Sequence, residues 1–228
     1  QMVYTGNPVR DAVLEAAKIA YRPAEAGGDF HLTVFGGSQG AQFFSAVVLK
    51  AIGLLTPELR ARLKVVQQAR NEDEQAVRSA YDVMAVRAKV ATFFADMPAH
   101  IADSPLLICR AGASTTAELA VIGRPAILVP YPHALDHDQA ANAALLAENG
   151  GGWVVEQSAI TPEWLAGELT RHMGNGAQLA EAAHKAKQQG RPDATERLAN
   201  VVELLARGEN VTQALIDQTH QTHTQTGY

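Results

Sequence analysis

Short apolar runs alternate with longer stretches of helical periodicity along most of the chain. The apolar runs predict strands at residues 30–35, 63–67, 90–94, 106–109, 126–129 and 153–155. Runs that are this short and uniformly apolar are typical of strands covered on both faces, as in a parallel sheet. The pattern therefore predicts an α/β fold with an open, doubly wound parallel sheet of the Rossmann-like kind.

Capping residues and apolar stripes predict where the helices lie. Asn7 followed by Pro8 favours a helix over residues 8–20, because Asn caps exposed amides and Pro suits the first helical position. Proline at positions 162 and 192 opens two later helices. From Asn210 onward the chain is rich in Thr, Gln and His, so we expect one domain over residues 1–207 and a flexible tail over 208–228.

Composition limits the possible partners. The 228 residues are 47% hydrophobic, enough for a sizeable core, and 19 Lys and Arg against 24 Asp and Glu give a net charge of −5. Because no basic block is present, nucleic acid is not an expected partner. The lone Cys109 fits a reducing compartment, and no apolar run approaches the ~20 residues of a membrane span. These features predict a cytoplasmic protein.

A glycine-rich turn joins the first predicted strand to a helix and reads Gly36-Gly37-Ser38-Gln39-Gly40-Ala41. Glycines let a ligand approach the backbone, and the free amides and helix dipole favour a phosphate there. The spacing fits neither a Walker loop nor Gly-x-Gly-x-x-Gly, which disfavours ATP and NAD. An ordinary tight turn remains an alternative.

A second turn of small residues follows Cys109, and a helix is expected to start near Thr115. Glu118 then lies one turn into the helix, where its carboxylate suits the two adjacent hydroxyls of a ribose. The alternative is a capping box, in which Thr115 and Glu118 bind backbone amides instead of a ligand.

The polar loop of residues 130–142 lies where open α/β sheets place ligand-binding loops. His133 and His137 invite a metal interpretation, but a loop with two prolines does not hold that spacing on a helical face, so we expect no metal. Gln139 and Asn142 better suit a neutral sugar, with helix capping as the alternative. Near a diphosphate, Arg10 would supply a permanent positive charge.

Taken together, these segments resemble the C-terminal half of the MurG family in order and spacing. The matching motifs are Thr5-Gly6-Asn7-Pro8-Val9-Arg10, Gly36-Gly37-Ser38-Gln39-Gly40-Ala41, Phe94-Ala95-Asp96-Met97, Cys109 to Glu118, Asp138-Gln139-Ala140-Ala141-Asn142-Ala143 and Pro192-Asp193-Ala194-Thr195-Glu196-Arg197. These bacterial enzymes transfer N-acetylglucosamine from its UDP form to the lipid-linked muramyl-pentapeptide precursor of peptidoglycan. The resemblance implies the donor-binding, C-terminal domain of a GT-B glycosyltransferase.

The resemblance also implies roles for individual residues. The diphosphate would be held by Gly37, Ser38, Gln39, Gly40 and Arg10. The uracil would lie against Phe94 with Met97 nearby, and the phosphate and ribose would be lined by Ala113, Ser114, Thr115 and Glu118. The sugar hydroxyls would be bound by Gln139, with Asp138 and Asn142 beside it.

For the intact protein, the resemblance implies an inverting, metal-independent transfer that needs no cofactor. The acceptor site, the membrane contact and the general base would lie in an N-terminal domain that precedes these residues, so no catalytic residue is assigned in this chain. The enzyme would act at the cytoplasmic face of the inner membrane. Where the family shows His-Gln-x-Gly, this chain has Gln67-Gln68-Ala69-Arg70, and we assign that loop no role.

Three other functions stay open. The first is a binding module: the chain would bind UDP-sugar and catalyse nothing on its own, since the second substrate has no site in these residues. A different GT-B enzyme, such as a UDP-N-acetylglucosamine 2-epimerase or a transferase with another acceptor, would share the same two-domain plan. A dinucleotide-binding oxidoreductase is disfavoured by the missing glycine spacing.

Overall fold

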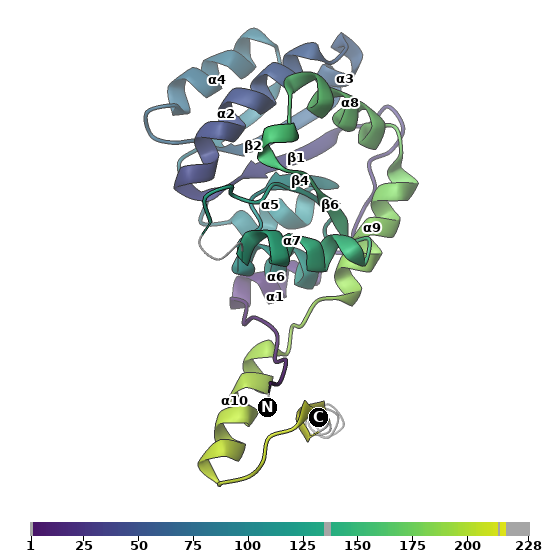
Figure 1. Cartoon of the computed structure of the whole chain (residues 1–228). Coiled ribbons are helices and arrows are strands. Elements are labelled where there is room, and N and C mark those ends of the chain that lie inside the picture. Colours follow the sequence, from purple (N-terminus) through teal and green to yellow (C-terminus); the bar gives the residue numbers. More distant parts are fainter. Residues whose placement is uncertain (1, 135–137, 214, 218–228) are drawn as a thin grey trace.

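The computed structural model describes residues 2–134, 138–213 and 215–217, with the backbone alone for residues 38–40, and this part contains a six-stranded parallel sheet between helical layers (Figure 1). The strands are β1 (Phe30–Phe35), β2 (Leu63–Gln68), β3 (Arg87–Ala91), β4 (Leu106–Cys109), β5 (Ala126–Leu128) and β6 (Gly152–Val154). The predicted α/β fold with a doubly wound parallel sheet is confirmed.

The order of the strands in the sheet is β3-β2-β1-β4-β5-β6. The chain therefore winds outward from β1 in one direction and from β4 in the other, so the topology reverses between these two neighbours. Phe35 pairs with Cys109 in the register of β1 and β4, which brings the carboxyl ends of both strands to one level. In open α/β sheets, ligands bind outside the carboxyl ends of the strands at such a switch point.

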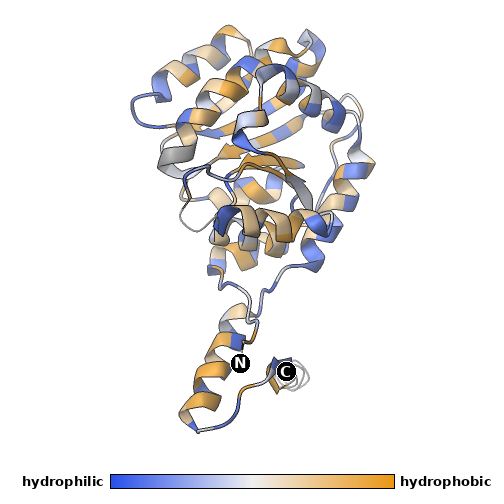
Figure 2. Cartoon of the chain, in the orientation of Figure 1, coloured by the Kyte–Doolittle hydropathy of each residue, from blue (hydrophilic) through white to orange (hydrophobic). Residues whose placement is uncertain are grey.

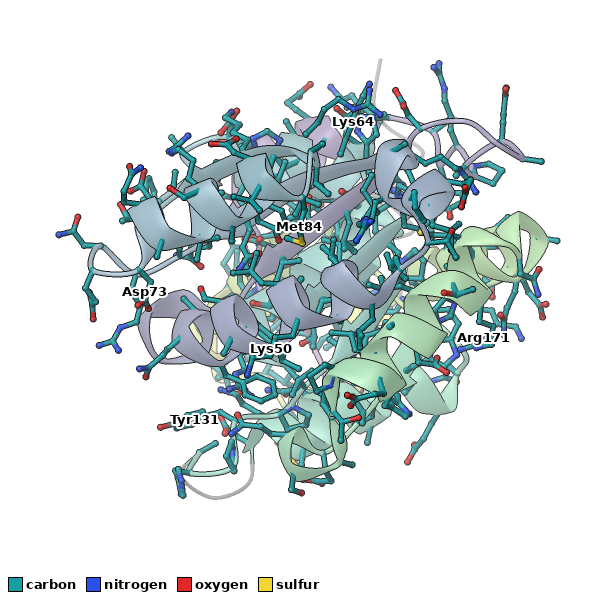
Figure 3. All side chains as sticks on the ribbon, turned by 90° about the horizontal axis from the view of Figure 1, so that it is seen from above. Lys50, Lys64, Asp73, Met84, Tyr131 and Arg171 are labelled. Carbon is teal, nitrogen blue, oxygen red and sulfur yellow. The ribbon has the colours of Figure 1, made fainter. Side chains whose placement is uncertain are left out.

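Helices cover both faces of the sheet. They are α1 (Asp11–Ala16), α2 (Gly37–Leu54), α3 (Pro57–Arg62), α4 (Glu74–Val83), α5 (Met97–Asp103), α6 (Ala113–Ile122), α7 (Asp138–Glu148), α8 (Pro162–Met173), α9 (Gly176–Gln188) and α10 (Ala194–Ala206). One core packs α2, α4 and α8 against the sheet, and Met84 adds to it between α2 and α4 (Figure 3). The other packs α1, α5, α6, α7 and α9 on the opposite face. Strand β4, at the centre of the sheet, is buried and hydrophobic along its whole length (Figure 2).

Strand β3 and helix α1 differ most from their predicted bounds. Strand β3 spans Arg87–Ala91, whereas the predicted strand covered residues 90–94. The prediction missed the start of β3 because this strand lies at the edge of the sheet and its exposed positions are polar, so they form no apolar run. Helix α1 spans Asp11–Ala16 with Arg10 at its N-cap, so it begins after the predicted start at Asn7 and Pro8 and ends short of residue 20. The buried guanidinium of Arg124 donates to the backbone carbonyl of Ile19 at 3.0 Å, so this carbonyl is satisfied outside a helix.

Helix α10 extends away from the sheet beside the N-terminal residues (Figure 1). Beyond it, Val211 and Ile216 are buried against Leu204, although little burial was expected after residue 210. The side chain of Gln213 bonds both the backbone amide and the carbonyl of Tyr4. In the part of the chain that the structure describes, none of the helices is both long and apolar enough to cross a bilayer.

Candidate functional site

A pocket of about 410 Å³ lies at the carboxyl ends of the strands, and we refer to it as the switch-point pocket. It is lined by Pro8, Val9, Arg10, Phe35, Gly37, Gln68, Phe93, Phe94, Met97, Ser114, Thr115 and Glu118. Residues from five separate segments of the chain meet here. Of the residues predicted from the sequence to bind a ligand, the pocket gathers Arg10, Gly37, Phe94, Met97, Ser114, Thr115 and Glu118.

The glycine-rich turn forms one wall of the switch-point pocket and starts helix α2. Gly37 has a φ of +65°, in the left-handed region that a residue with a side chain rarely adopts. The first turn of α2 therefore follows directly from β1, with its amides at the positive end of the helix dipole. For Ser38, Gln39 and Gly40, the structure describes the backbone alone.

Helix α6 supplies a second N-terminus to the same pocket. It begins at Ala113 after Gly112, two residues earlier than predicted from the sequence. Thr115 therefore lies inside the first turn and is not the capping residue, which contradicts the capping box with Glu118. Ser114 and Thr115 line the pocket from this first turn, where helical amides have no partner within the helix.

Glu118 lies one turn further along α6 and forms an ion pair across the pocket. Arg10, the residue before α1, donates from Nη2 to Oε1 of Glu118 at 3.0 Å. The Arg10 side chain is 60% exposed, whereas that of Glu118 is 12% exposed. The cation thus points into solvent at the pocket mouth, while the carboxylate lies deeper.

Two adjacent phenylalanines follow β3 and lie in different environments. Phe94 is buried, and its ring packs edge-on against His100 with the centroids 5.3 Å apart. Burial lowers the pKa of His100, although Asp96 opposes this effect, so the imidazole beneath Phe94 is neutral at pH 7. Phe93 is 73% exposed and also lines the pocket. The sequence analysis did not single out Phe93 as a pocket residue. The two adjacent phenylalanines just after a strand could have indicated it, because successive side chains in an extended segment point to opposite sides.

Gln68, the last residue of β2, was assigned no role from the sequence, yet it lines the switch-point pocket. Its side-chain oxygen Oε1 accepts hydrogen bonds from the backbone amides of Gly37 at 3.1 Å and Gly36 at 3.4 Å. Its Nε2 donates to the carbonyl of Thr92 at 3.0 Å. Gln68 therefore joins the loops that follow three neighbouring strands.

The residues predicted to bind sugar hydroxyls lie apart from this pocket. Oε1 of Gln139 accepts from the amide of Tyr131 at 3.0 Å, and Nδ2 of Asn142 donates to the carbonyl of Ala111 at 3.2 Å. Asp138 is exposed at the start of α7. Asn142 and the predicted Ala113 line a second pocket, of about 380 Å³, on the other side of α6. Neither described pocket includes Asp138 or Gln139.

Arg110 explains how the loop between β5 and α7 is held. Its guanidinium is buried, donates to the carbonyls of Val129 and Pro130 at 3.1 and 3.2 Å, and lies 5.3 Å from the ring centroid of Tyr131, which is labelled in Figure 3. Burial lowers the pKa of this guanidinium, but arginine stays protonated in water at pH 7. The loop that carries Tyr131 towards Gln139 is thus tied to the carboxyl end of β4.

His133 and His137 are the two histidines of the loop before α7. His137 lies outside the described residues. Among residues 2–134, 138–213 and 215–217, no group of three or more His, Cys, Asp and Glu side chains is placed to hold a metal ion.

The doubly wound parallel sheet, with a pocket at its switch point between two helix N-termini, has the fold of one domain of a GT-B glycosyltransferase. Comparison with known proteins identifies the particular family. The model of the glycosyltransferase family 28 C-terminal domain matches residues 31–198, and the chain belongs to this family.

Relatives and solved structures agree with this assignment. The chain is 56% identical over 211 residues to the UDP-N-acetylglucosamine–N-acetylmuramyl-(pentapeptide) pyrophosphoryl-undecaprenol N-acetylglucosamine transferase of Chelativorans sp. (strain BNC1), a match that covers 92% of this chain and 56% of the relative. The crystal structure of MurG from Acinetobacter baumannii is similar with a TM-score of 0.71 and 31% identity, over 81% of this chain and 55% of that one. The glycosyltransferase VinC, solved with dTDP, shares the fold at 17% identity with a TM-score of 0.59, over 91% of this chain and 47% of that one.

The chain spans about half the length of the curated relatives that it matches. The family model, the relatives and the MurG structure together confirm the resemblance of this chain to the C-terminal half of the MurG family.

Proposed function

We propose that the switch-point pocket binds UDP-N-acetylglucosamine as the glycosyl donor. The observation that carries the proposal is the meeting of two helix N-termini with an exposed arginine and the shielded carboxylate that it pairs with, in a single pocket at the topological switch point. Amides and arginine match a diphosphate, and a carboxylate matches the paired hydroxyls of a ribose. The names of the 56% identical relatives specify this donor.

The diphosphate would lie between the first turns of α2 and α6, within reach of Arg10. Two helix dipoles and a bidentate guanidinium stabilise the negative charge that develops on a departing UDP. Each charge-assisted hydrogen bond contributes roughly 1.5–3 kcal/mol, so a few of them supply the stabilisation that a divalent cation supplies elsewhere. The proposed transfer is therefore metal-independent.

The uridine would extend towards the end of β3. Phe93 offers an exposed ring face to the uracil, Phe94 and Met97 form the apolar wall, and Glu118 accepts from the ribose hydroxyls. Because Arg10 already pairs with Glu118, donor binding would divide this pair between two ligand groups, the diphosphate for Arg10 and the ribose for Glu118.

The N-acetylglucosamine ring would point towards the N-terminus of α7, where Asp138, Gln139 and Asn142 begin the helix. Ser38, Gln39 and Gly40 belong to the proposed diphosphate loop, and Ala113 borders it at the start of α6.

For the intact protein, we propose inverting transfer of N-acetylglucosamine to the lipid-linked muramyl-pentapeptide precursor, from lipid I to lipid II. An acceptor hydroxyl attacks the anomeric carbon, the bond to the diphosphate breaks, and UDP leaves with the electron pair. The base that takes the hydroxyl proton would come from the part of the relatives that this chain does not span. With a lipid-linked acceptor and a nucleotide-sugar donor, the intact enzyme would act at the cytoplasmic face of the inner membrane.

Titration calorimetry of this chain with UDP-N-acetylglucosamine, UDP, NAD and ATP tests the proposal, with each titration repeated in EDTA. We expect binding of the two uridine ligands, unchanged by the chelator. Binding of NAD alone, or loss of UDP binding in EDTA, would contradict it.

A further inference from the structure

Gln68 lies between the two halves of the switch-point pocket. Strand β2, which it ends, is the neighbour of both β1 and β3 in the sheet. The loop after β1 carries Gly36 and Gly37, where the diphosphate would bind, and the loop after β3 carries Thr92 and Phe93, where the base would bind. A side chain from β2 can therefore touch both loops at once.

Both the oxygen and the nitrogen of the Gln68 side-chain amide form hydrogen bonds. Its oxygen accepts from the amides of Gly36 and Gly37, and its nitrogen donates to the carbonyl of Thr92. A carboxylate can accept but cannot donate when ionised, and an ammonium can donate but cannot accept. The three hydrogen bonds together thus select a side-chain amide of this length and fix its orientation.

The loop that Gln68 holds has little restraint of its own. Gly36 and Gly37 have no side chains, and Gly37 adopts a left-handed φ of +65° with open space where a side chain would begin. Glycine loses more conformational freedom on ordering than any other residue. The bonds from Gln68 therefore keep the entry to α2 in one conformation before a ligand arrives.

We propose that Gln68 is a positioning residue that sets the spacing between the diphosphate loop and the base-side loop, so that both halves of one UDP molecule are engaged together. The inference rests on the proposed function of the same pocket. When two subsites act on one linked ligand, the second contact is intramolecular, and its benefit depends on the span between the subsites. Loss of the correct spacing therefore weakens the linked ligand more than either separate half.

The test compares Gln68→Leu with the wild-type chain in titrations of UDP, uridine and inorganic pyrophosphate. We expect UDP to bind at least about tenfold more weakly to the variant, while uridine and pyrophosphate change by less than about twofold. Amide hydrogen exchange at Gly36 and Gly37 should be faster, because their acceptor is gone. Gln75→Leu serves as the matched control, since Gln75 is an exposed glutamine on α4 whose Nε2 donates to the hydroxyl of Ser79, one turn further along the same helix.

Gln68→Glu provides a second variant of nearly the same shape. It keeps an acceptor for the two glycine amides but faces the Thr92 carbonyl with a carboxylate, so amide protection at Gly36 and Gly37 should persist. Because the added negative charge repels UDP and pyrophosphate alike, the two losses are compared, and UDP should lose at least about tenfold more affinity than inorganic pyrophosphate. This variant decides the question if Gln68→Leu does not fold.

Each outcome has one meaning. UDP affinity within about twofold of wild type in both variants would overturn the role of Gln68 while leaving the proposed function intact. A parallel loss for UDP, uridine and pyrophosphate would show a general structural role and also overturn it. A wild-type chain that does not bind UDP would refute the proposed function and, with it, this inference.

Discussion

Arg10 and Glu118 are 108 positions apart in sequence, yet their side chains meet at 3.0 Å across the switch-point pocket. The pair joins the segment before α1 to the second turn of α6. It also shields two groups of opposite charge that the proposed ligand would use separately, the cation for its diphosphate and the carboxylate for its ribose. Donor binding is therefore expected to separate the two side chains.

Glu118→Ala should weaken UDP binding by roughly 1–3 kcal/mol, because the ribose hydroxyls lose their acceptor. The melting temperature should change little, since a partly exposed ion pair contributes only about 0–1 kcal/mol. Calorimetry and thermal unfolding measure the two effects. Glu15→Ala, which removes the exposed Glu15–Lys18 ion pair on the edge of α1, is the control. Unchanged affinity with a lower melting temperature would show that Glu118 serves the fold alone.

Arg10→Ala should weaken UDP binding by about 1.5–3 kcal/mol and leave uridine binding nearly unchanged, because the diphosphate is the only part of the ligand that the guanidinium would contact. The dependence of UDP affinity on salt concentration should become shallower as well. Titrations of UDP and uridine at two salt concentrations check both effects, with Arg22→Ala as an exposed arginine outside the pocket. Equal losses for UDP and uridine would remove Arg10 from the diphosphate site.

Phe93 and Phe94 form a matched pair of adjacent side chains with opposite exposure. Phe93→Ala should weaken uridine and UDP alike with little change in stability, because its ring is 73% exposed. Phe94→Ala should lower the free energy of unfolding by about 3–5 kcal/mol, because a buried ring is removed. Urea unfolding and uridine titration separate the two. Normal uridine binding by Phe93→Ala would return the base-side role to Phe94 alone.

Gln139→Ala should weaken UDP-N-acetylglucosamine more than UDP, since only the former carries the sugar. The contact between Oε1 of Gln139 and the amide of Tyr131 adds a structural effect, which Gln139→Glu controls for because it keeps an acceptor in place. Competition titrations with both ligands give the ratio of affinities. Equal losses for the two ligands would exclude Gln139 from the sugar subsite.

The parts of the fold that the sequence predicted are those whose pattern is local. Phe30–Phe35 and Leu106–Cys109 are central strands buried on both faces, so an apolar run marks them directly. The edge strand β3 carries Arg87 and Lys89 on its exposed positions, and its start was missed for that reason. Strand order depends on which runs pair across long separations, and no local pattern reports it.

The site was predictable to the extent that it depends on backbone. The two loops after β1 and β4 were found from their small residues, because close approach of a backbone needs them. Gln68 and Arg110 were missed, because their roles come from hydrogen bonds to loops 24 to 32 residues away for Gln68 and 19 to 20 residues away for Arg110. The capping box expected as an alternative for Thr115 and Glu118 required α6 to start near Thr115, but α6 starts at Ala113. A sequence does not fix the start of a helix to within two residues.

His172 makes the stability of the domain sensitive to acid. The side chain on α8 is fully buried against Trp153, with ring centroids 4.1 Å apart, and its Nε2 lies 3.0 Å from Nη2 of Arg171. An arginine nitrogen can only donate, so Nε2 accepts and the ring is neutral. Burial lowers the pKa of His172 from 6.5 to about 4, with a further decrease from Arg171 and an opposing effect of Glu168.

The sign of the pH effect follows from this shift. Because the folded protein binds the proton less tightly than the unfolded chain, protonation favours unfolding, so stability is fully present above pH 6.5 and falls towards pH 4. Between pH 7.5 and 4.5 His172 should cost the wild-type chain roughly 2–3 kcal/mol of unfolding free energy. His172→Phe removes the titrating group and keeps a ring against Trp153, and His184→Phe is the exposed control on α9. Urea unfolding at several pH values should show a flatter profile for His172→Phe alone; a slope equal to that of the wild-type chain would mean that His172 is not the group that titrates.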